Sequence, residues 1–294
     1  MTPSCDTGVG CLLDLQQSDG GWAYGTNSAW TEPTAYSVLA LRTAGAPPQA
    51  ICRGSEWLAR KQRRDGGWSP GPAVEQSTHV TSLAVLALSG APGYEEIAER
   101  GVHWLVTQTG AETSIWARLA RMAVGTNTGA TDHIGWPWFP GAAAWVIPTS
   151  LAICALSRHQ QGIYGAGIAS RIGEARAFLL SRRCPDQGWN HGGLFRNGET
   201  PMSYPETTGI ALLALAATKG VGVEVEASIR CGEQHAQDPK SSEGANWLRL
   251  GLAAHGRNPA TQAARYRDWT VNQMALGIIT QVGAAGRNPF IDHV

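Results

Sequence analysis

The sequence lacks an excess of charge of either sign, because its 294 residues include 23 Lys and Arg and 23 Asp and Glu. This balance offers no basic surface for nucleic acid or for an anionic membrane. The longest apolar run, near 210–217, falls far short of the ~20 residues of a membrane-spanning helix, and no secretory signal pattern is evident. We therefore expect a cytoplasmic protein without a transmembrane segment or a nucleic-acid partner, and no pattern specifies an oligomeric state.

Familiar metal and cofactor motifs are also missing. The six cysteines form no C-x-x-C pair, and a cytosolic chain of this size needs no disulfides, so we expect reduced thiols. There is no D-D-x-x-D cluster for magnesium, no G-x-S-x-G motif and no G-x-x-x-x-G-K-[ST] loop. These absences predict no metal and no cofactor.

A repeated heptad is the most informative feature that is present. Gln16–Trp22 reads QQSDGGW, Gln62–Trp68 reads QRRDGGW, and a degenerate third copy, Arg183–Trp189, reads RCPDQGW. Each copy lies between an amphipathic stretch and an apolar one, as expected for stacked supersecondary units. Glycine supplies the backbone conformation that ends a helix. We expect the Trp of each copy to pack back over the turn in a structural role.

This Q-x-x-D-G-G-W signature resembles the QW repeat of the superfamily of squalene–hopene cyclases, oxidosqualene cyclases and protein prenyltransferase β-subunits. The resemblance covers roughly residues 8 to 256 and implies an all-α fold, an (α/α)6 toroid of six inner and about six outer helices. We expect residues 1–294 to form one such domain. The chain lacks the D-x-C zinc pattern of the prenyltransferases and the D-x-D-D-T acid motif of the cyclases.

Apolar stretches with helical spacing predict the helices of this ring. Inner helices are expected near 33–45, 77–90, 112–125, 147–158, 205–219 and 243–256. Outer helices are expected near 8–18, 48–63, 94–108, 167–182 and 222–236, with a C-terminal segment near 260–284 closing the ring. No outer helix is predicted between the third and fourth inner ones. The Gly-, Trp- and Pro-rich segment 125–146 takes its place, and we expect it to cover the mouth where the inner helices begin.

Ionisable residues fall at the starts of five of the predicted inner helices. The candidate catalytic residues are Glu32, His79, Glu112, Glu206 and Glu243. Matching Tyr204-Pro205-Glu206-Thr207-Thr208 to the cyclase motif puts Glu206 at the position of its proton-donating Asp, and Glu32 aligns equally well. A Glu in the first turn also simply complements the helix dipole, so each one has a purely structural alternative.

Aromatic residues are concentrated in the same places, and Trp, with twelve copies, outnumbers Tyr and Phe. Aromatic faces stabilise cations, although core packing is the simpler explanation for any single ring. A repeated E-x-x-x-W-x-R-L pattern adds two Arg residues, which either pair with the Glu residues or hold an anion. The candidate substrate-binding residues are Trp30, Tyr36, Trp116, Trp138, Trp145, Tyr204, Trp247, Arg118 and Arg249.

Three functions are compatible with these patterns. The resemblance implies a terpene cyclase-like enzyme, an isomerase or lyase, that folds a small apolar, isoprenoid substrate in an aromatic cavity and protonates it from Glu206 or Glu32, with His79 as partner. The first alternative is a non-catalytic toroid that binds an apolar ligand or a partner protein. The second is a carbohydrate-active α/α toroid with paired carboxylates at its mouth.

Overall fold

The computed structural model describes residues 8–25, 28–113, 133–161, 165–193, 201–218, 222–258, 269–283 and 286–292. Within these ranges the regular elements are helices, joined by turns with isolated β-bridges. They are α1 (Gly8–Asp14), α2 (Thr31–Thr43), α3 (Pro48–Lys61), α4 (Val80–Leu88), α5 (Glu95–Thr107), η1 (Ala111–Thr113), α7 (Val146–Ser157), α8 (Gly165–Ser181), α9 (Pro205–Ala217), η3 (Val223–Val225), α10 (Glu226–Gln237), α11 (Ser242–Ala253) and α12 (Val271–Gly283).

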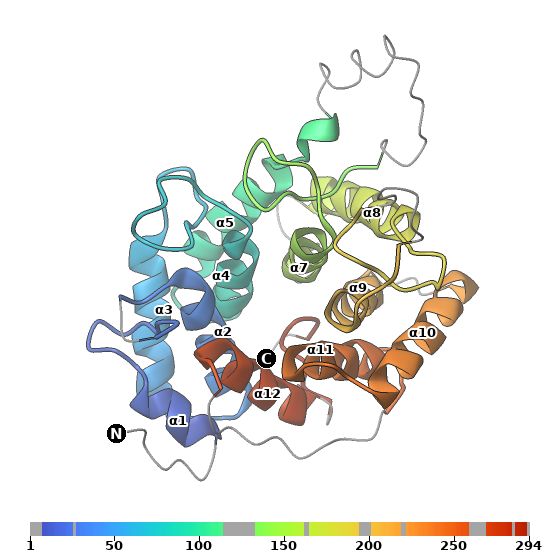
Figure 1. The fold of residues 1–294 in the computed structure, drawn as a ribbon. Helices are drawn as coiled ribbons and strands as arrows, with labels where there is room; N and C mark the ends of the chain where they lie inside the picture. Colours follow the sequence, from blue (N-terminus) through green and yellow to red (C-terminus); the bar gives the residue numbers. More distant parts are fainter. Residues whose placement is uncertain are drawn as a thin grey trace.

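The inner layer is a closed ring of the helices α2, α4, α7, α9, α11 and α12. Each packs against the next, and α12 packs against α2 (Figure 1). Helices α1, α3, α5, α8 and α10 lie outside this ring. Helices α1, α3, α5 and α10 each contact two inner helices, and α8 packs against the inner helix α7 and the outer helix α5. The predicted α/α toroid is therefore confirmed. None of the described helices combines the length and the apolar character needed to cross a membrane.

One of the helix predictions is wrong, and another falls largely on residues that the structure does not describe. Segment 112–125 was expected to be the third inner helix, but α4 packs directly against α7, and residues 111–113 form the 3-10 turn η1. Residues 114–132 lie outside the described part of the chain. The C-terminal segment was expected among the outer helices, whereas α12 is the sixth inner one because its apolar residues pack against both α2 and α11.

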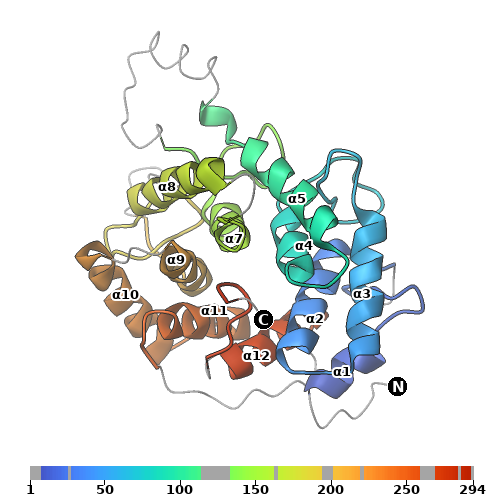
Figure 2. The ribbon, with the colours of Figure 1, turned by 180° about the vertical axis from the view of Figure 1, so that it is seen from behind.

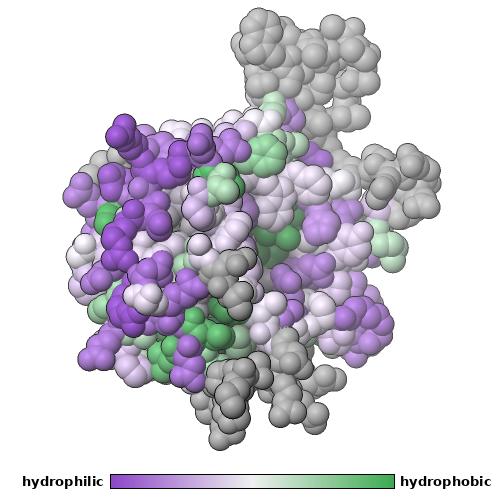
Figure 3. Space-filling model, turned by 60° about the vertical axis from the view of Figure 1, so that its left-hand side comes forward, coloured by the Kyte–Doolittle hydropathy of each residue, from purple (hydrophilic) through white to green (hydrophobic). Residues whose placement is uncertain are grey.

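Burial explains which helices are inner and which are outer. All nine residues of α4 are buried, whereas α3 buries one face and exposes the other. A helix that is apolar on all sides needs neighbours all around it, and an amphipathic helix needs them on one side only. Gly45 and Gly90, with φ of 66° and 75°, reverse the chain after α2 and α4. Figure 3 shows an outward face with mostly hydrophilic side chains and smaller apolar areas.

The Trp of each repeated heptad makes the same pair of contacts. The indole Nε1–H of Trp22, Trp68 and Trp189 donates to the carbonyl of the residue ten positions earlier, at 2.7 Å in each case. The backbone N–H of each Trp donates to a Thr Oγ1 on the following inner helix, at 2.9–3.0 Å. All three side chains are fully buried. The turns thus lock each outer helix to the next inner helix.

A fourth turn of this kind is centred on Trp136. Its Nε1–H donates to the Leu105 carbonyl and its backbone N–H to Thr149 Oγ1, both at 2.9 Å. The carbonyl acceptor lies 31 residues upstream instead of ten, so the chain between α5 and Trp136 is an insertion within a repeat. The heptad pattern does not reveal this turn, because only its final Gly-Trp is retained here.

The segment 286–292 closes the end of the ring where the inner helices finish. It lies within the ring (Figure 2), and Phe290 is fully buried, with its ring centroid 6.5 Å from that of Tyr36. Arg158, at the end of α7, donates to the carbonyls of Leu86 at 3.3 Å and Pro289 at 3.1 Å. The opposite end, where the inner helices begin, holds the candidate site.

Candidate functional site

Three carboxylates meet at the starts of inner helices. Glu32, Glu206 and Glu243 lie in the first turns of α2, α9 and α11. A Cβ placed on Gly244 would lie 3.5 Å from Glu206 Oε2, so the first turns of α9 and α11 are in contact. Glu243 interacts electrostatically with both Glu32 and Glu206. We call these three residues the carboxylate cluster.

Burial is the main reason why protons are held tightly in this cluster. It raises the pKa of Glu32 above its ordinary value, and the charge of Glu243 raises this pKa further, whereas the hydrogen bond from the Tyr24 hydroxyl lowers it. Glu243 is exposed at the surface, and its partial desolvation, followed by the charge of Glu206, raises its pKa. A hydrogen bond with the Trp247 side chain opposes this rise. Crowded carboxyls of this kind are suited to general acid chemistry.

Two amide side chains near the cluster have unused polar atoms. In the part of the chain that the structure describes, Oδ1 of Asn272 and Nδ2 of Asn246 are buried and have no hydrogen-bond partner. Asn272 lies in the first turn of α12 and interacts with the hydroxyl of Tyr24, and Asn246 lies one turn after Glu243. Buried polar groups are normally paired. No sequence pattern points to Tyr24 or Asn272, because their proximity depends on closure of the ring by α12. Asn246 lies within the repeated E-x-x-x-W-x-R-L pattern, but that pattern does not show that its amide is unpaired.

The aromatic candidates separate into a buried group and an exposed group. Tyr36 and Trp247 are buried, and the Trp247 ring centroid lies 5.2 Å from that of Phe290. Trp145 and Tyr204 are 37% and 43% exposed, and His191 lies between them, with ring centroids 6.2 and 5.4 Å away. The first group is packed as core, as the structural alternative anticipated, and the second forms an exposed aromatic rim. His191 was missed because it belongs to a long loop.

Aromatic residues also occupy the N-cap positions of three inner helices. Trp30, Trp145 and Tyr204 precede α2, α7 and α9, and none makes a side-chain capping hydrogen bond. Trp30 packs edge-on against Tyr24 at 5.6 Å. By contrast, Ser241 caps α11 by accepting from the Gly244 N–H at 3.0 Å. Capping residues are worth ~1 kcal/mol, so helix stability does not explain the aromatic residues at these starts.

His79 was expected to be the partner of the proton-donating Glu, but its contacts are with Trp138. Both its backbone N–H and its Nδ1 are within hydrogen-bonding distance of the Trp138 carbonyl, at 3.0 and 3.2 Å, and its ring is edge-on to Trp138 at 4.4 Å. Burial lowers the pKa of His79 to about 4, so its imidazole is neutral near pH 7. These contacts hold the described part of the predicted covering segment, 133–145, against the start of α4.

The remaining candidates lie outside the cluster or outside the described residues. Glu112 is in η1 instead of an inner helix, and its carboxylate accepts from the Ala144 N–H at 3.0 and 3.1 Å. Glu112 therefore holds the covering segment and does not belong to the carboxylate cluster. Arg249 lies on α11 and is partly buried. Trp116 and Arg118 lie outside the described residues.

Comparison with known proteins gives a local sequence match and several fold matches. No protein-family model matches the chain. A drimenyl diphosphate synthase from Streptantibioticus cattleyicolor is 41% identical over 63 residues, which span 21% of this chain and 12% of that enzyme. The fold is similar to endo-β-1,4-glucanase CMCax from Acetobacter xylinum (TM-score 0.63, 11% identity, 95% of this chain and 98% of that one). It is also similar to a protein from Actinoplanes (TM-score 0.60, 18% identity, 95% of this chain and 97% of that one).

A type II terpene cyclase, MstE from Scytonema, aligns with 95% of this chain and 96% of its own at 16% identity, with a TM-score of 0.43. At these identities the glucanase and the Actinoplanes protein show similarity of fold alone, and chemistry has to be inferred from the site itself.

Proposed function

We propose that this protein is a terpene cyclase-like enzyme that protonates an apolar, isoprenoid substrate at the mouth of the toroid. The observation that carries the proposal is the carboxylate cluster, in which desolvation raises the pKa of Glu32 and Glu243. The local match to a drimenyl diphosphate synthase supports an isoprenoid diphosphate as the substrate class. Glu32 is the preferred acid because its pKa is raised, whereas Glu206 acts on Glu243 by charge.

The proposed reaction is an isomerisation, since the proton added at the start is matched by a proton lost at the end. Glu32 transfers its proton to one carbon of a terminal alkene, which leaves a cation on the neighbouring carbon. The π electrons of the next alkene form the ring C–C bond. The resulting cation loses a proton to water, which yields the product, and Glu32 takes up a proton from solvent for the next turnover. The aromatic faces of Tyr24, whose hydroxyl is hydrogen-bonded to Glu32, and of Trp30, which packs against Tyr24, stabilise the cation.

The neighbouring groups have supporting roles in this proposal. Glu243 raises the pKa of Glu32, which keeps the proton available nearer to neutral pH. The unpaired amide atoms of Asn246 and Asn272 offer a donor and an acceptor to the polar part of a bound substrate. The exposed rings of Trp145 and Tyr204 contact the apolar chain at the entrance.

Incubation with farnesyl and geranylgeranyl diphosphate in D2O tests the proposal, with products analysed by mass spectrometry. We expect a cyclised product that contains one deuterium on carbon for each initiating protonation, however many rings close after it. Glu32→Gln should reduce turnover by at least ~100-fold, in line with the contribution of a general acid. Glu96→Gln is the matched control, because Glu96 lies in the first turn of the outer helix α5.

Two results would contradict the assignment. Full turnover by both the Glu32→Gln and Glu206→Gln variants would show that the proton comes from elsewhere. Stoichiometric retention of the isoprenoid without turnover would instead favour the binding module.

A carbohydrate-active toroid is the second candidate, favoured by the coexistence of clustered carboxylates with the exposed rings of Trp145 and Tyr204. Glycosidases use two carboxyl groups, and sugars stack on aromatic faces at such entrances. Release of reducing ends from a β-1,4-glucan, lost in Glu243→Gln, would support this function over cyclisation.

A further inference from the structure

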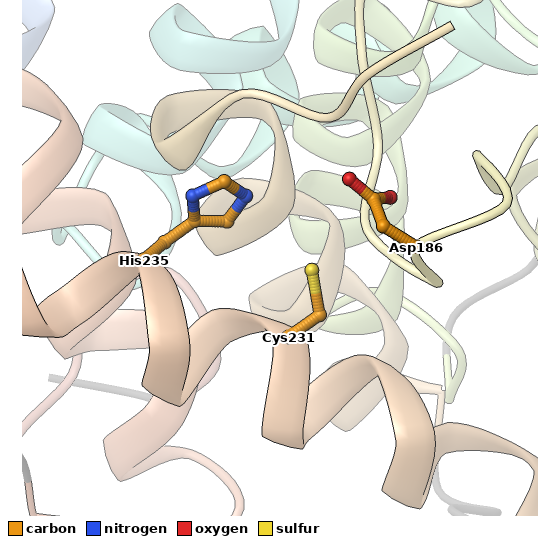
Figure 4. A group of neighbouring side chains, drawn as sticks. All are labelled: Asp186, Cys231 and His235. Carbon is orange, nitrogen blue, oxygen red and sulfur yellow. The ribbon is translucent and has the colours of Figure 1, made fainter. Parts of the chain in front are cut away.

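A second group of reactive side chains lies away from the mouth, where the third repeat turn meets the outer helix α10. Asp186, Cys231 and His235 point toward one another there (Figure 4), and one potential ligand atom from each lies within 4.8 Å of the others. Cys231 and His235 are four residues apart on α10 and so share one face of that helix. Asp186 comes from the turn after α8, 45 residues before Cys231. Because of this separation, no short sequence motif reveals the group.

The corresponding position in the first repeat shows what is unusual here. There the outer helix α3 presents Trp57, whose Nε1–H donates to Asp19 Oδ2 at 2.9 Å. A Cβ on Gly21 of this turn would lie 2.9 Å from the Trp57 ring, so the indole covers the turn closely. In the second repeat Trp104 covers Gly67 in the same way.

In the third repeat the covering indole is replaced by side chains of types that can bind a metal ion. Cys231 follows Thr208 by 23 residues, as Trp57 follows Thr34 and Trp104 follows Thr81, and these three Thr make equivalent contacts. Cys231 is therefore the counterpart of the two Trp residues. The smaller thiol, together with the imidazole one turn later, faces the Asp that the indole faces in the first repeat.

The three groups converge on one point. Ser203 Oγ lies 2.8 Å from Asp186 Oδ2, 2.7 Å from His235 Nε2 and 3.6 Å from Cys231 Sγ. A single hydroxyl thus contacts all three potential ligands. Cys231 is buried, His235 is partly buried and Asp186 is the most exposed of the three, so the convergence point lies between the buried face of α10 and the surface of the turn.

We propose that Asp186, Cys231 and His235 bind a Zn2+ ion, with the Ser203 hydroxyl or a water molecule as the fourth ligand. A thiolate, an imidazole and a carboxylate form a set that zinc accepts in tetrahedral geometry. Metal–ligand distances of about 2.0–2.3 Å require the three groups to close by about 1 Å from their present separation. Binding displaces the thiol proton of Cys231.

A metal ion here would influence the mouth through the start of α9. Asp186 lies before residues 187–202 in the sequence, and Ser203 follows them. Ser203 directly precedes Tyr204 and the α9 turn that carries Glu206. Linking Asp186 and Ser203 to α10 fixes the start of α9. The proposed ion is therefore structural, and its assignment is independent of the reaction proposed above.

Cobalt binding to the reduced, chelator-stripped protein tests the assignment. We expect one Co2+ per chain, a thiolate-to-cobalt charge-transfer absorption, and displacement of both by Zn2+. Cys231→Ser should abolish the absorption, and His235→Asn and Asp186→Asn should weaken binding by at least ~10-fold. Asp65→Asn is the matched control, because Asp65 has the place of Asp186 in the second turn and Trp104 covers that turn. Cys52→Ser controls for an exposed thiol.

The absence of stoichiometric Co2+ binding would overturn the proposal. So would an absorption that persists in Cys231→Ser or is lost equally in Cys52→Ser, since either result would show an adventitious ion only. Circular dichroism of each metal-free variant establishes that it folds. Should Cys231→Ser fail to fold, loss of binding in folded His235→Asn decides the question, and unchanged affinity in that variant would refute the site.

Discussion

The repeat turns have the same contacts in every repeat, whereas the helix starts at the mouth of the ring differ from one repeat to the next. At Trp22, Trp68, Trp136 and Trp189 the same two hydrogen bonds recur at nearly the same lengths, despite loops and insertions of different size. At the mouth, the starts of equivalent helices carry different residues that make different contacts. Glu32 joins a carboxylate cluster, whereas His79 is engaged by a backbone carbonyl.

This difference separates stability from function. The recurrent contacts lock successive helix pairs, and a toroid needs them in every repeat to remain closed. The mouth carries aromatic N-caps, a carboxylate with a raised pKa and unpaired buried amides, none of which helix formation requires. Local features that stability does not explain are candidates for function.

The largest expected effect tests whether all four turns are equivalent. Trp68→Ala and Trp136→Ala should each lower the free energy of unfolding by roughly 3–5 kcal/mol, because each removes a buried indole and its hydrogen bond. Denaturant unfolding measures both values. A loss below about 1 kcal/mol for Trp136→Ala alone would show that the fourth turn is not a structural repeat.

The next effect concerns pH and His79. With a pKa of about 4 in the folded state against 6.5 ordinarily, this imidazole binds protons better in the unfolded chain. Its contribution to stability is complete above pH 6.5 and falls by about 3 kcal/mol as the pH drops to 4. Unfolding of wild type and His79→Gln across this range measures the difference. Parallel pH profiles would mean that His79 titrates normally.

A smaller loss is expected from the Thr residues of the turns. Thr81→Val and Thr149→Val each leave the backbone N–H of a buried Trp without its acceptor, which should cost ~1–3 kcal/mol. Ser37→Ala is the control, since its buried hydroxyl has no hydrogen-bond partner among the described residues and should cost less. Equal decreases in the free energy of unfolding for all three variants would show that the Thr contacts have no special role in stability.

The smallest effect has the opposite sign. Tyr204→Ser places a capping residue before α9 and should raise the free energy of unfolding by ~0.5–1 kcal/mol, while impairing turnover at the mouth. Thermal unfolding and the deuterium assay measure the two quantities. A destabilised variant with unchanged turnover would assign Tyr204 to packing instead.

The repeated heptads made the ring predictable, because each marks a helix end whose side-chain contacts are local. Most inner and outer helices, and the positions of Glu32, Glu206 and Glu243 at helix starts, follow from that register. The Trp136 turn did not, since an insertion separates it from its partner carbonyl. The contact of His79 with Trp138 links residues 59 positions apart, and spacing alone does not reveal such pairs.

The central claim is that Glu32 holds its proton above the ordinary carboxyl range because of burial and the charge of Glu243. Carbon-13 NMR titration of the Glu side-chain carboxyls, assigned through Glu32→Gln, measures this directly. The account predicts a pKa for Glu32 above 4.5 that falls when Glu243 is replaced by Gln. A pKa at or below 4.5, unchanged in Glu243→Gln, would contradict it.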